Sequence, residues 1–273
     1  GYEDMVVGTL YQSGCPLSRH VTYLRTNSKA YILYLSSTQT PDETPETIKD
    51  ISMEEALKYD YWDVIIMQGG VFHIAESDTY TNGDIQVIQQ YVKENSKNPN
   101  AVFAWNMTWV PPVDSYLMNT KGDDGYLTGY TAYGVNRETM YKEVVKCVTN
   151  HIATDDTFQY IIPSGTVFEN ALTSYLTERD MHRDYVHATD LARVMVSYAW
   201  FCRLTGLEKI EEIKLTSIPK KFLVYKNLPG LTRELTEEEK ALIIETVNNA
   251  LAKPFEATQS QYTKAPANYI PLG

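Results

Sequence analysis

The sequence predicts an α/β domain with a mostly parallel sheet that helices cover on both faces. Three short apolar runs, at residues 63–67, 101–105 and 158–162, have the composition of strands buried on both faces. Helical stretches separate these runs, which is the order that a parallel sheet requires. The chain has 273 residues, of which 43% are hydrophobic, and this is enough for a sizeable core.

The elements before this sheet are predicted from local patterns. Residues 5–10 are apolar, which indicates a buried strand that runs into a Gly/Pro turn. Residues 20–36 hold two runs rich in Tyr, Leu and Ile around a polar turn, which predicts a hairpin. Ser52 and Glu55 have the spacing of a capping box, so a short helix is predicted from there to about residue 59.

The later elements follow from helical spacing and from the signals that start and stop helices. A long loop at residues 106–134 is rich in aromatic residues, which favours a cleft wall. Thr236 and Glu239 form a second capping box that opens a helix to about residue 252, and residues 257–273 indicate an extended tail. Further helices are predicted at residues 83–97, 135–150, 167–175 and 188–204, the last stopped by Gly206.

We predict a main α/β domain over residues 1–207 and a C-terminal appendage over residues 208–273 that packs on it. The net charge of -11 and the pI near 5.0 argue against a nucleic-acid partner, because no basic cluster offsets the repulsion. No apolar run has the length of a membrane span. The cysteines, Cys15, Cys147 and Cys202, are far apart and show neither a disulfide framework nor metal spacing. Neither a cofactor nor a metal is predicted.

The strongest chemical signal is Asp184 followed three residues later by His187, between a polar loop and an apolar helical run. An Asp at this spacing can fold back on the His, accept its Nδ1 proton and leave Nε2 as a general base. Asp-x-x-His is a weak motif alone. The plainer alternative is that Asp184 caps the helix that follows.

Other candidate residues share one location, at or just beyond the ends of predicted strands. Gly14 could present a backbone N–H to a ligand, and Gln68 could donate to a developing oxyanion. Asn106, Trp109 and Ser164 are candidates for the substrate cleft. Each has a structural alternative: Gly14 a simple turn, Gln68 a tie to its own loop, and Ser164 a helix cap.

Five ordered blocks resemble a family of bacterial proteins, common in Bacteroides-like organisms, within the SGNH (GDSL-like) hydrolase superfamily. The similarity covers roughly residues 5–206, and the blocks together are far more specific than any one alone. The blocks are residues 14–20 (GCPLSRH), 62–68 (WDVIIMQ), 105–109 (WNMTW), 162–166 (IPSGT) and 183–187 (RDYVH).

The resemblance implies a flavodoxin-like three-layer α/β/α fold and a Ser-His-Asp esterase site without metal. Asp184 and His187 match the superfamily's Asp-x-x-His block, Gly14 matches its oxyanion glycine, and Gln68 stands where the superfamily usually has Asn. The implied serine belongs to a block at the end of the first strand, and the resemblance places that strand and that serine ahead of Gly1. Neither Ser13 nor Ser164 fits the role, so we expect little hydrolysis from this chain alone.

The favoured function is a serine esterase acting on a small-molecule or glycan ester, with a carbohydrate O-acetyl ester as the expected substrate. The resemblance favours a periplasmic or secreted location, and the sequence leaves the oligomeric state open. A second hypothesis is a glycan-binding or structural module that has kept this fold without the chemistry. A third is metal-dependent hydrolysis by His20, His73, His182 and His187, although their spacing does not support it.

Overall fold

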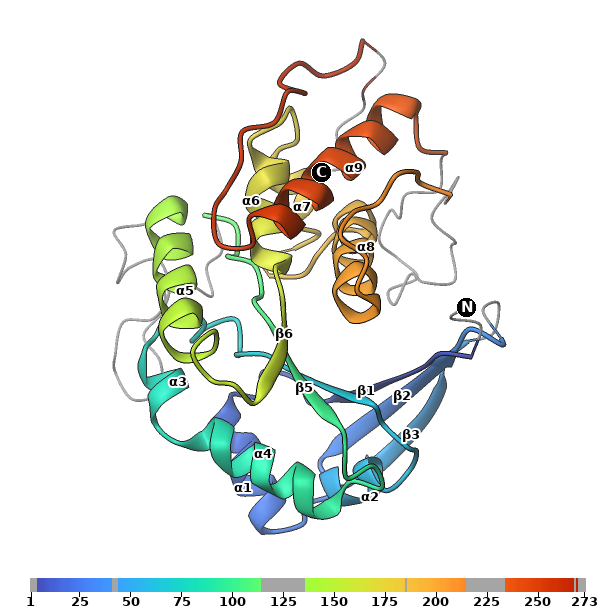
Figure 1. Ribbon diagram of the computed structural model, residues 1–273, viewed down its shortest axis with the longest axis vertical. Helices are drawn as coiled ribbons and strands as arrows, with labels where there is room; N and C mark the ends of the chain where they lie inside the picture. The colour runs from blue at the N-terminus through green and yellow to red at the C-terminus, as the bar shows by residue number, and fades with distance from the viewer. Residues whose placement is uncertain are drawn as a thin grey trace. The chain divides into compact units, whose positions relative to one another are not determined.

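The computed structural model describes residues 4–40, 44–113, 136–184, 186–214, 234–267 and 269 (Figure 1). The chain folds as two compact units. The first unit consists of Gly1–Ile65 and Ser77–Phe103, and the second unit consists of Ile66–Glu76 and Ala104–Gly273. The domain boundary predicted after residue 207 stays a prediction.

Along the described residues, helices separate the strands β4, β5 and β6, and four helices follow β6. The order is β1 (Val6–Tyr11), α1 (Leu17–Arg25), β2 (Tyr31–Ser37), β3 (Glu46–Ile51), α2 (Met53–Leu57), β4 (Val64–Met67), α3 (Asp78–Thr81), α4 (Asp84–Asn95), β5 (Val102–Asn106), α5 (Arg137–His151), β6 (Phe158–Ile162), α6 (Ser164–Leu172), α7 (Glu178–Met181), α8 (Asp190–Thr205) and α9 (Glu237–Ala252).

An antiparallel sheet in the order β1-β2-β3 organises the first unit. Tyr31, Leu33 and Leu35 alternate along β2 and are buried, as expected for a strand with one face on a core. Strand β1 forms where it was predicted, but Val6 and Val7 are about half exposed, so the prediction that it is buried is wrong. An apolar run predicts burial only when both faces of its sheet are covered.

The hairpin predicted at residues 20–36 is also wrong, because its first half is helical. Leu17, Val21 and Leu24 recur at spacings of four and three and form the buried side of α1. The helix ends before Asn27, which adopts a left-handed conformation with φ of 45°. These residues have the composition of a strand, but the spacing of their apolar members has the period of a helix.

The second sheet has the order β4-β5-β6 and is parallel. Its strands lie at or within one residue of the three predicted apolar runs, and the predicted mixed α/β class with a parallel sheet is confirmed. The pairing continues past β5, since the Met107 amide donates to the Ile162 carbonyl over 3.0 Å. Trp105 of β5 is 1% exposed and packs edge-on against Phe158 of β6.

Helices α6, α8 and α9 pack together in the second unit and enclose its apolar core. The predicted helix end at Gly206 and the predicted helix start at Thr236 are both confirmed, since Gly206 is left-handed after α8 and Thr236 forms a capping box with Glu239 at the start of α9. Core residues include Val167, Phe168, Ala171, Leu191, Ala192, Met195, Leu242, Ile243 and Val247.

The segment after α9 has no regular structure, yet it is fastened to the helices where an extended tail was predicted. The Thr258 amide donates to the Asn170 side chain over 2.6 Å. Ser260 is buried, and its hydroxyl donates to Glu245 of α9 over 2.5 Å. Residues 257–262 are therefore part of the second unit's packing.

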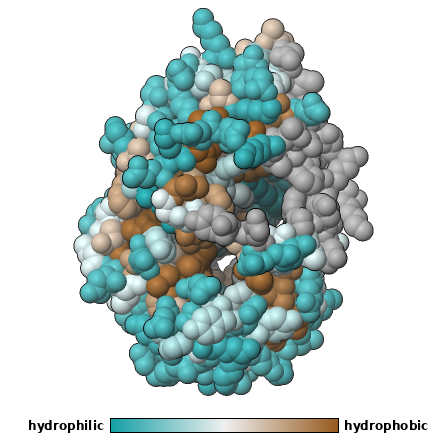
Figure 2. All heavy atoms as spheres, turned by 45° about the vertical axis from the view of Figure 1, so that its right-hand side comes forward, coloured by the Kyte–Doolittle hydropathy of each residue, from teal (hydrophilic) through white to brown (hydrophobic). Residues whose placement is uncertain are grey.

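Most of the coloured surface in Figure 2 is hydrophilic, and hydrophobic residues gather in separate patches. This matches a chain in which 22% of residues are charged. None of the helices in the described residues combines the length and the hydrophobicity that a membrane span requires.

Candidate functional site

The Asp184–His187 loop is closed at its base by main-chain pairing. His182 and Ala188 form an antiparallel bridge, and the Arg183 amide donates to the His187 carbonyl over 2.8 Å. Tyr185, between them, lies outside the described residues. The loop is therefore a short turn fixed at both ends, of the kind that holds side chains in place on a rigid scaffold.

Within this loop the Asp184 carboxylate lies against the His187 ring. Nδ1 of His187 is 2.9 Å from each carboxylate oxygen. The carboxylate also accepts hydrogen bonds from the Val186 amide over 3.0 Å and from the His187 amide over 2.9 Å. The His187 side chain is 55% exposed. Since a carboxylate only accepts, Nδ1 carries the proton in the neutral ring and Nε2 is left as a base that solvent can reach.

The hydrogen bonds to Asp184 keep its carboxylate ionised. Partial burial by itself would raise the pKa of Asp184, but the hydrogen bonds from Val186 and His187 outweigh burial and lower it to about 2. A depressed carboxyl pKa stabilises the fold above the unfolded value, near 3.8, and this contribution is lost as the pH falls through about 2. Asp184 is therefore an anion across the neutral range and keeps orienting His187.

Asp184 does not cap the helix that follows, so that alternative is excluded. The N-cap of α8 is Thr189, whose hydroxyl oxygen accepts from the Ala192 amide over 3.2 Å. The Thr189 hydroxyl proton goes to the Asp180 carbonyl over 2.6 Å. The Asp184 carboxylate is thus committed to its own loop and to His187.

Trp109 connects this loop to the segment after β5. Its indole N–H donates to the Val186 carbonyl over 2.9 Å. Its ring stacks on Phe168 of α6, with centroids 4.6 Å apart and planes 8° from parallel. Trp109 therefore fixes the His187 loop to helix α6 and to the segment after β5. Its role as a substrate-cleft residue stays a prediction.

The Trp109 hydrogen bond should be detectable in amide exchange. We expect Trp109→Phe, which keeps the stacked ring, to speed exchange at the Val186 and His187 amides about fivefold, because one hydrogen bond contributes about 1 kcal/mol. Trp62→Phe is the matched control, since Trp62 also donates over 2.9 Å to a main-chain carbonyl, but in the first unit. Equal protection in both variants would show that Trp109 does not hold the loop.

Gln68, Asn106 and Ser164 follow the ends of β4, β5 and β6, and the structure brings their side chains together. The Asn106 amide donates to Gln68 Oε1 over 2.9 Å, and the Ser164 hydroxyl donates to Asn106 Oδ1 over 2.6 Å. Gln68 is exposed, whereas Asn106 is 2% and Ser164 0% exposed. Asn106 and Ser164 therefore lie behind Gln68, in the interior, and their burial does not favour the predicted contact with a substrate.

Ser164 is also not a helix cap. It is the first residue of α6, whose N-cap position is Pro163, and no side chain caps this end. The Gly165 amide donates instead to the Met107 carbonyl over 2.7 Å. A Cβ on Gly165 would lie 2.7 Å from the Thr108 carbonyl oxygen, so only glycine allows α6 to start this close to the segment after β5.

One short segment, residues 106–109, thus supports both candidate groups. Asn106 at its start holds the Gln68 amide, and Trp109 at its end holds the carbonyl of Val186, next to His187. Three residues span at most about 11 Å of extended chain. All of these residues belong to the second unit. The remainder of the predicted aromatic loop, residues 114–135 with Tyr116, Tyr126 and Tyr130, lies outside the described residues.

Gly14 belongs to the first unit. It has φ of +55°, it is exposed, and no atom lies within 4 Å of the position that a Cβ would take. A glycine is favoured there because other residues rarely adopt this conformation. Its predicted role in an oxyanion hole stays a prediction.

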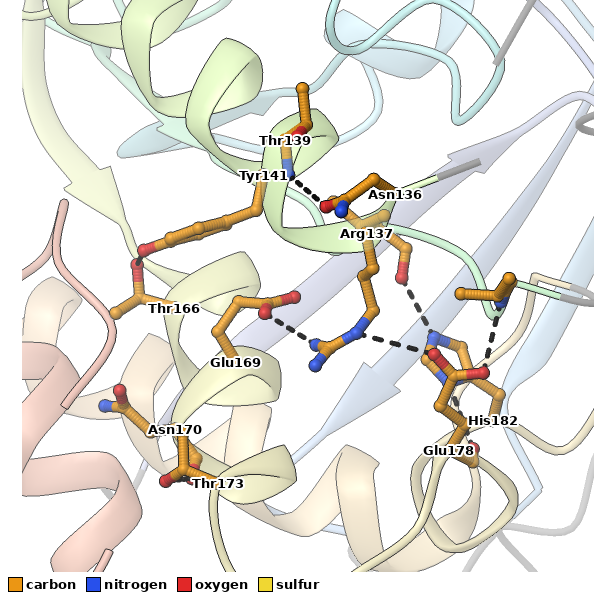
Figure 3. A network of polar contacts seen from close by, with 12 residues as sticks. Asn136, Arg137, Thr139, Tyr141, Thr166, Glu169, Asn170, Thr173, Glu178 and His182 are labelled. Atoms are coloured by element: carbon orange, nitrogen blue, oxygen red, sulfur yellow. Dashed lines mark hydrogen bonds and ion pairs between the residues drawn. The ribbon is translucent and has the colours of Figure 1, made fainter. Parts of the chain in front are cut away.

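Sequence reasoning did not single out the ion-pair network around Arg137 (Figure 3). The guanidinium lies between Glu169, 2.6 Å away, and Glu178, 3.4 Å away. Burial raises the pKa of Glu169 to about 7, with further raising by Glu178 and Glu138, against the lowering effect of Arg137. The Glu178 carboxylate also accepts from the Val113 amide over 3.1 Å. This network ties α5 to α6 and α7.

The other histidines proposed as metal ligands have separate partners. His20 contacts the Tyr31 hydroxyl at 2.8 Å, and His73 contacts Glu76 at 2.7 Å. Both ring nitrogens of His182 face main-chain carbonyls, those of Glu178 at 3.1 Å and Val110 at 3.0 Å. Burial lowers the pKa of His182 to about 4, so this ring is neutral at pH 7. The described residues contain no group of three or more His, Cys, Asp or Glu that could hold a metal ion.

Comparison with known proteins gives a family and a fold. Residues 3–216 match the family DUF4886, described as a domain of unknown function. The crystal structure of a DUF4886 family protein from Bacteroides uniformis ATCC 8492 is similar, with a TM-score of 0.74 and 24% sequence identity over 96% of this chain and 88% of that one. This likeness concerns the fold. No curated protein matches the chain.

Proposed function

The chain belongs to the DUF4886 family, and from this premise and the geometry of its second unit we propose that it serves ester hydrolysis of the SGNH (GDSL-like) type. The observation that carries the proposal is the Asp184–His187 pair. The Asp184 carboxylate is charged, the His187 Nδ1 is hydrogen-bonded to it at 2.9 Å, and the His187 side chain, which carries Nε2, is 55% exposed. This is the arrangement that a general base requires.

The proposed reaction uses these groups in sequence. A serine hydroxyl attacks the acyl carbon while His187 Nε2 takes its proton, and the carbonyl oxygen becomes an oxyanion that Gln68 stabilises. The intermediate then collapses, and His187 returns the proton to the departing alcohol. Water hydrolyses the acyl-enzyme by the same steps. The serine is the one that the family resemblance implies, and we assign it to no residue of this chain.

The proposed substrate class is an acetyl ester of a carbohydrate. This choice depends on the resemblance to the superfamily, where such esters are common substrates.

The proposal is tested by ester turnover in the full-length protein. We expect hydrolysis of p-nitrophenyl acetate and release of acetate from an acetylated polysaccharide, both unaffected by EDTA. Binding on a glycan array without any ester turnover would favour the binding-module hypothesis instead. Loss of turnover with EDTA, restored by added metal, would favour metal-dependent hydrolysis.

A further inference from the structure

A continuous chain of side-chain hydrogen bonds leads from helix α8 to the exposed amide of Gln68. The Trp200 indole N–H donates to Ser164 Oγ over 3.0 Å. Ser164 donates to Asn106 over 2.6 Å, and Asn106 donates to Gln68 over 2.9 Å. The four residues come from α8, α6, β5 and the end of β4, and all belong to the second unit.

The direction of this hydrogen-bond chain is fixed at Ser164. Its oxygen accepts from the Trp200 indole, and its single proton goes to Asn106 Oδ1. The Asn106 amide is thereby oriented with Nδ2 toward Gln68. Gln68 receives this hydrogen bond on Oε1, which leaves its Nε2 and both N–H bonds facing away from the chain. The orientation of both amides therefore follows from the network.

Burial enforces this direction. Ser164 is 0% and Asn106 2% exposed, so water cannot replace a partner that either residue loses. Reversing the Gln68 amide would set its N–H bonds against those of Asn106, unless Asn106 and Ser164 reversed as well. The buried Ser164 oxygen would then accept from both Trp200 and Asn106, and the Ser164 proton would lose the acceptor that it has in Asn106 Oδ1. The exposed Gln68 amide is thus held as a donor by the buried residues Asn106 and Ser164.

We infer that Trp200, Ser164 and Asn106 are positioning residues that present the Gln68 Nε2–H bonds to a ligand oxygen that carries negative charge. This rests on the proposed function, in which that oxygen is the oxyanion of an ester hydrolysis. A glutamine free to rotate would present its own carbonyl oxygen half of the time and would repel the developing charge. The hydrogen bonds from Trp200 through Ser164 and Asn106 exclude this reversed glutamine before substrate binds. Preorganised stabilisation of an oxyanion requires such a fixed donor.

A double-mutant cycle on turnover tests the inference. Gln68→Ala should lower kcat by about 100-fold with KM little changed, because an oxyanion donor acts mainly in the transition state. Ser164→Ala should lower kcat by about tenfold, since Asn106 and Gln68 are then free to reverse. In the Gln68→Ala background, Ser164→Ala should have no further effect on kcat.

A matched control separates positioning from folding. Ser174→Ala removes a serine hydroxyl from the second unit that bonds only to the Ala171 carbonyl and the Leu176 amide, and it should leave kcat unchanged. If Ser164→Ala does not fold, Ser164→Cys takes its place in the cycle, since a thiol is a much weaker hydrogen-bond donor to Asn106. A Ser164→Ala effect on kcat that persists fully without Gln68 would overturn the inference.

A second measurement keeps the inference testable without any esterase activity. In side-chain amide NMR, couplings across hydrogen bonds should show only the bond from Asn106 Nδ2 to Gln68 Oε1 in the wild type, and in Ser164→Ala they should also show the reverse bond from Gln68 Nε2 to Asn106 Oδ1. If Ser164→Ala shows this spectral change and the protein has no ester turnover, the positioning of Gln68 by hydrogen bonds is supported and the proposed function is contradicted. Identical Gln68 spectra in the two proteins would overturn the inference, whatever the turnover.

Discussion

Replacing His187 with alanine should slow the turnover of p-nitrophenyl acetate by about 10³- to 10⁴-fold in the full-length protein. The variant loses the base that takes the serine proton and returns it to the alcohol. The side chain is 55% exposed, so the free energy of unfolding should change by no more than about 0.5 kcal/mol. Steady-state kinetics and urea unfolding of the same preparations measure both quantities.

Two further variants sharpen this test. Asp184→Asn keeps an acceptor for the Val186 and His187 amides but turns an N–H toward His187 Nδ1, which favours the wrong tautomer. It should cost nearly as much turnover as His187→Ala, and the double variant no more than either. His73→Ala is the histidine control and should be fully active. Turnover that survives His187→Ala would remove this residue from the mechanism.

Replacing Arg137 with methionine should destabilise the protein by about 1–2 kcal/mol more at pH 8 than at pH 5, because at pH 8 the Glu169 carboxylate, 7% exposed, is left buried without its partner and must take up a proton. Without the guanidinium the pKa of Glu169 rises further above its ordinary value of 4.5, so the carboxyl is neutral in the folded variant at pH 5. Urea unfolding at both pH values measures the difference.

The sign of this dependence follows from linkage. A carboxyl whose pKa is raised by folding contributes stability below its unfolded pKa, and that contribution is lost as the pH rises through the folded value. For wild-type Glu169 this window runs from about 4.5 to about 7. Adding Glu169→Gln to Arg137→Met should recover most of the loss at pH 8. An equal loss at both pH values would show that packing by Arg137, and not the buried charge, is what the fold needs.

The parallel sheet was predictable from sequence because each of its strands is apolar along its length. Residues 64–67, 102–106 and 158–162 are strands close to the predicted positions. The first sheet was less predictable. Strand β3 is polar and its register depends on pairing with β2, which no local pattern encodes. The residues of α1 are rich in β-formers, and only their spacing marks them as helical.

The candidate site was predictable where chemistry is local. Asp184 and His187 are three residues apart, so a turn alone brings them together. Gln68, Asn106 and Ser164 were found by their place after strand ends, but their order in depth, with Gln68 outside and the others within, depends on tertiary packing. Trp200 was missed because it lies in an apolar helical run, where its one polar atom gives no signal.

The short segment of residues 106–109 determines how the candidate site responds when the backbone moves. Asn106 at one end is hydrogen-bonded to Gln68, and Trp109 at the other end is hydrogen-bonded to Val186, next to His187. A movement of this segment would therefore move Gln68 and the His187 loop in the same direction. The distance between Gln68 and His187 would stay the same during such a movement. A designer who wished to alter that distance would lengthen or shorten this segment, and a designer who wished to preserve it could freely change the outer surface around it.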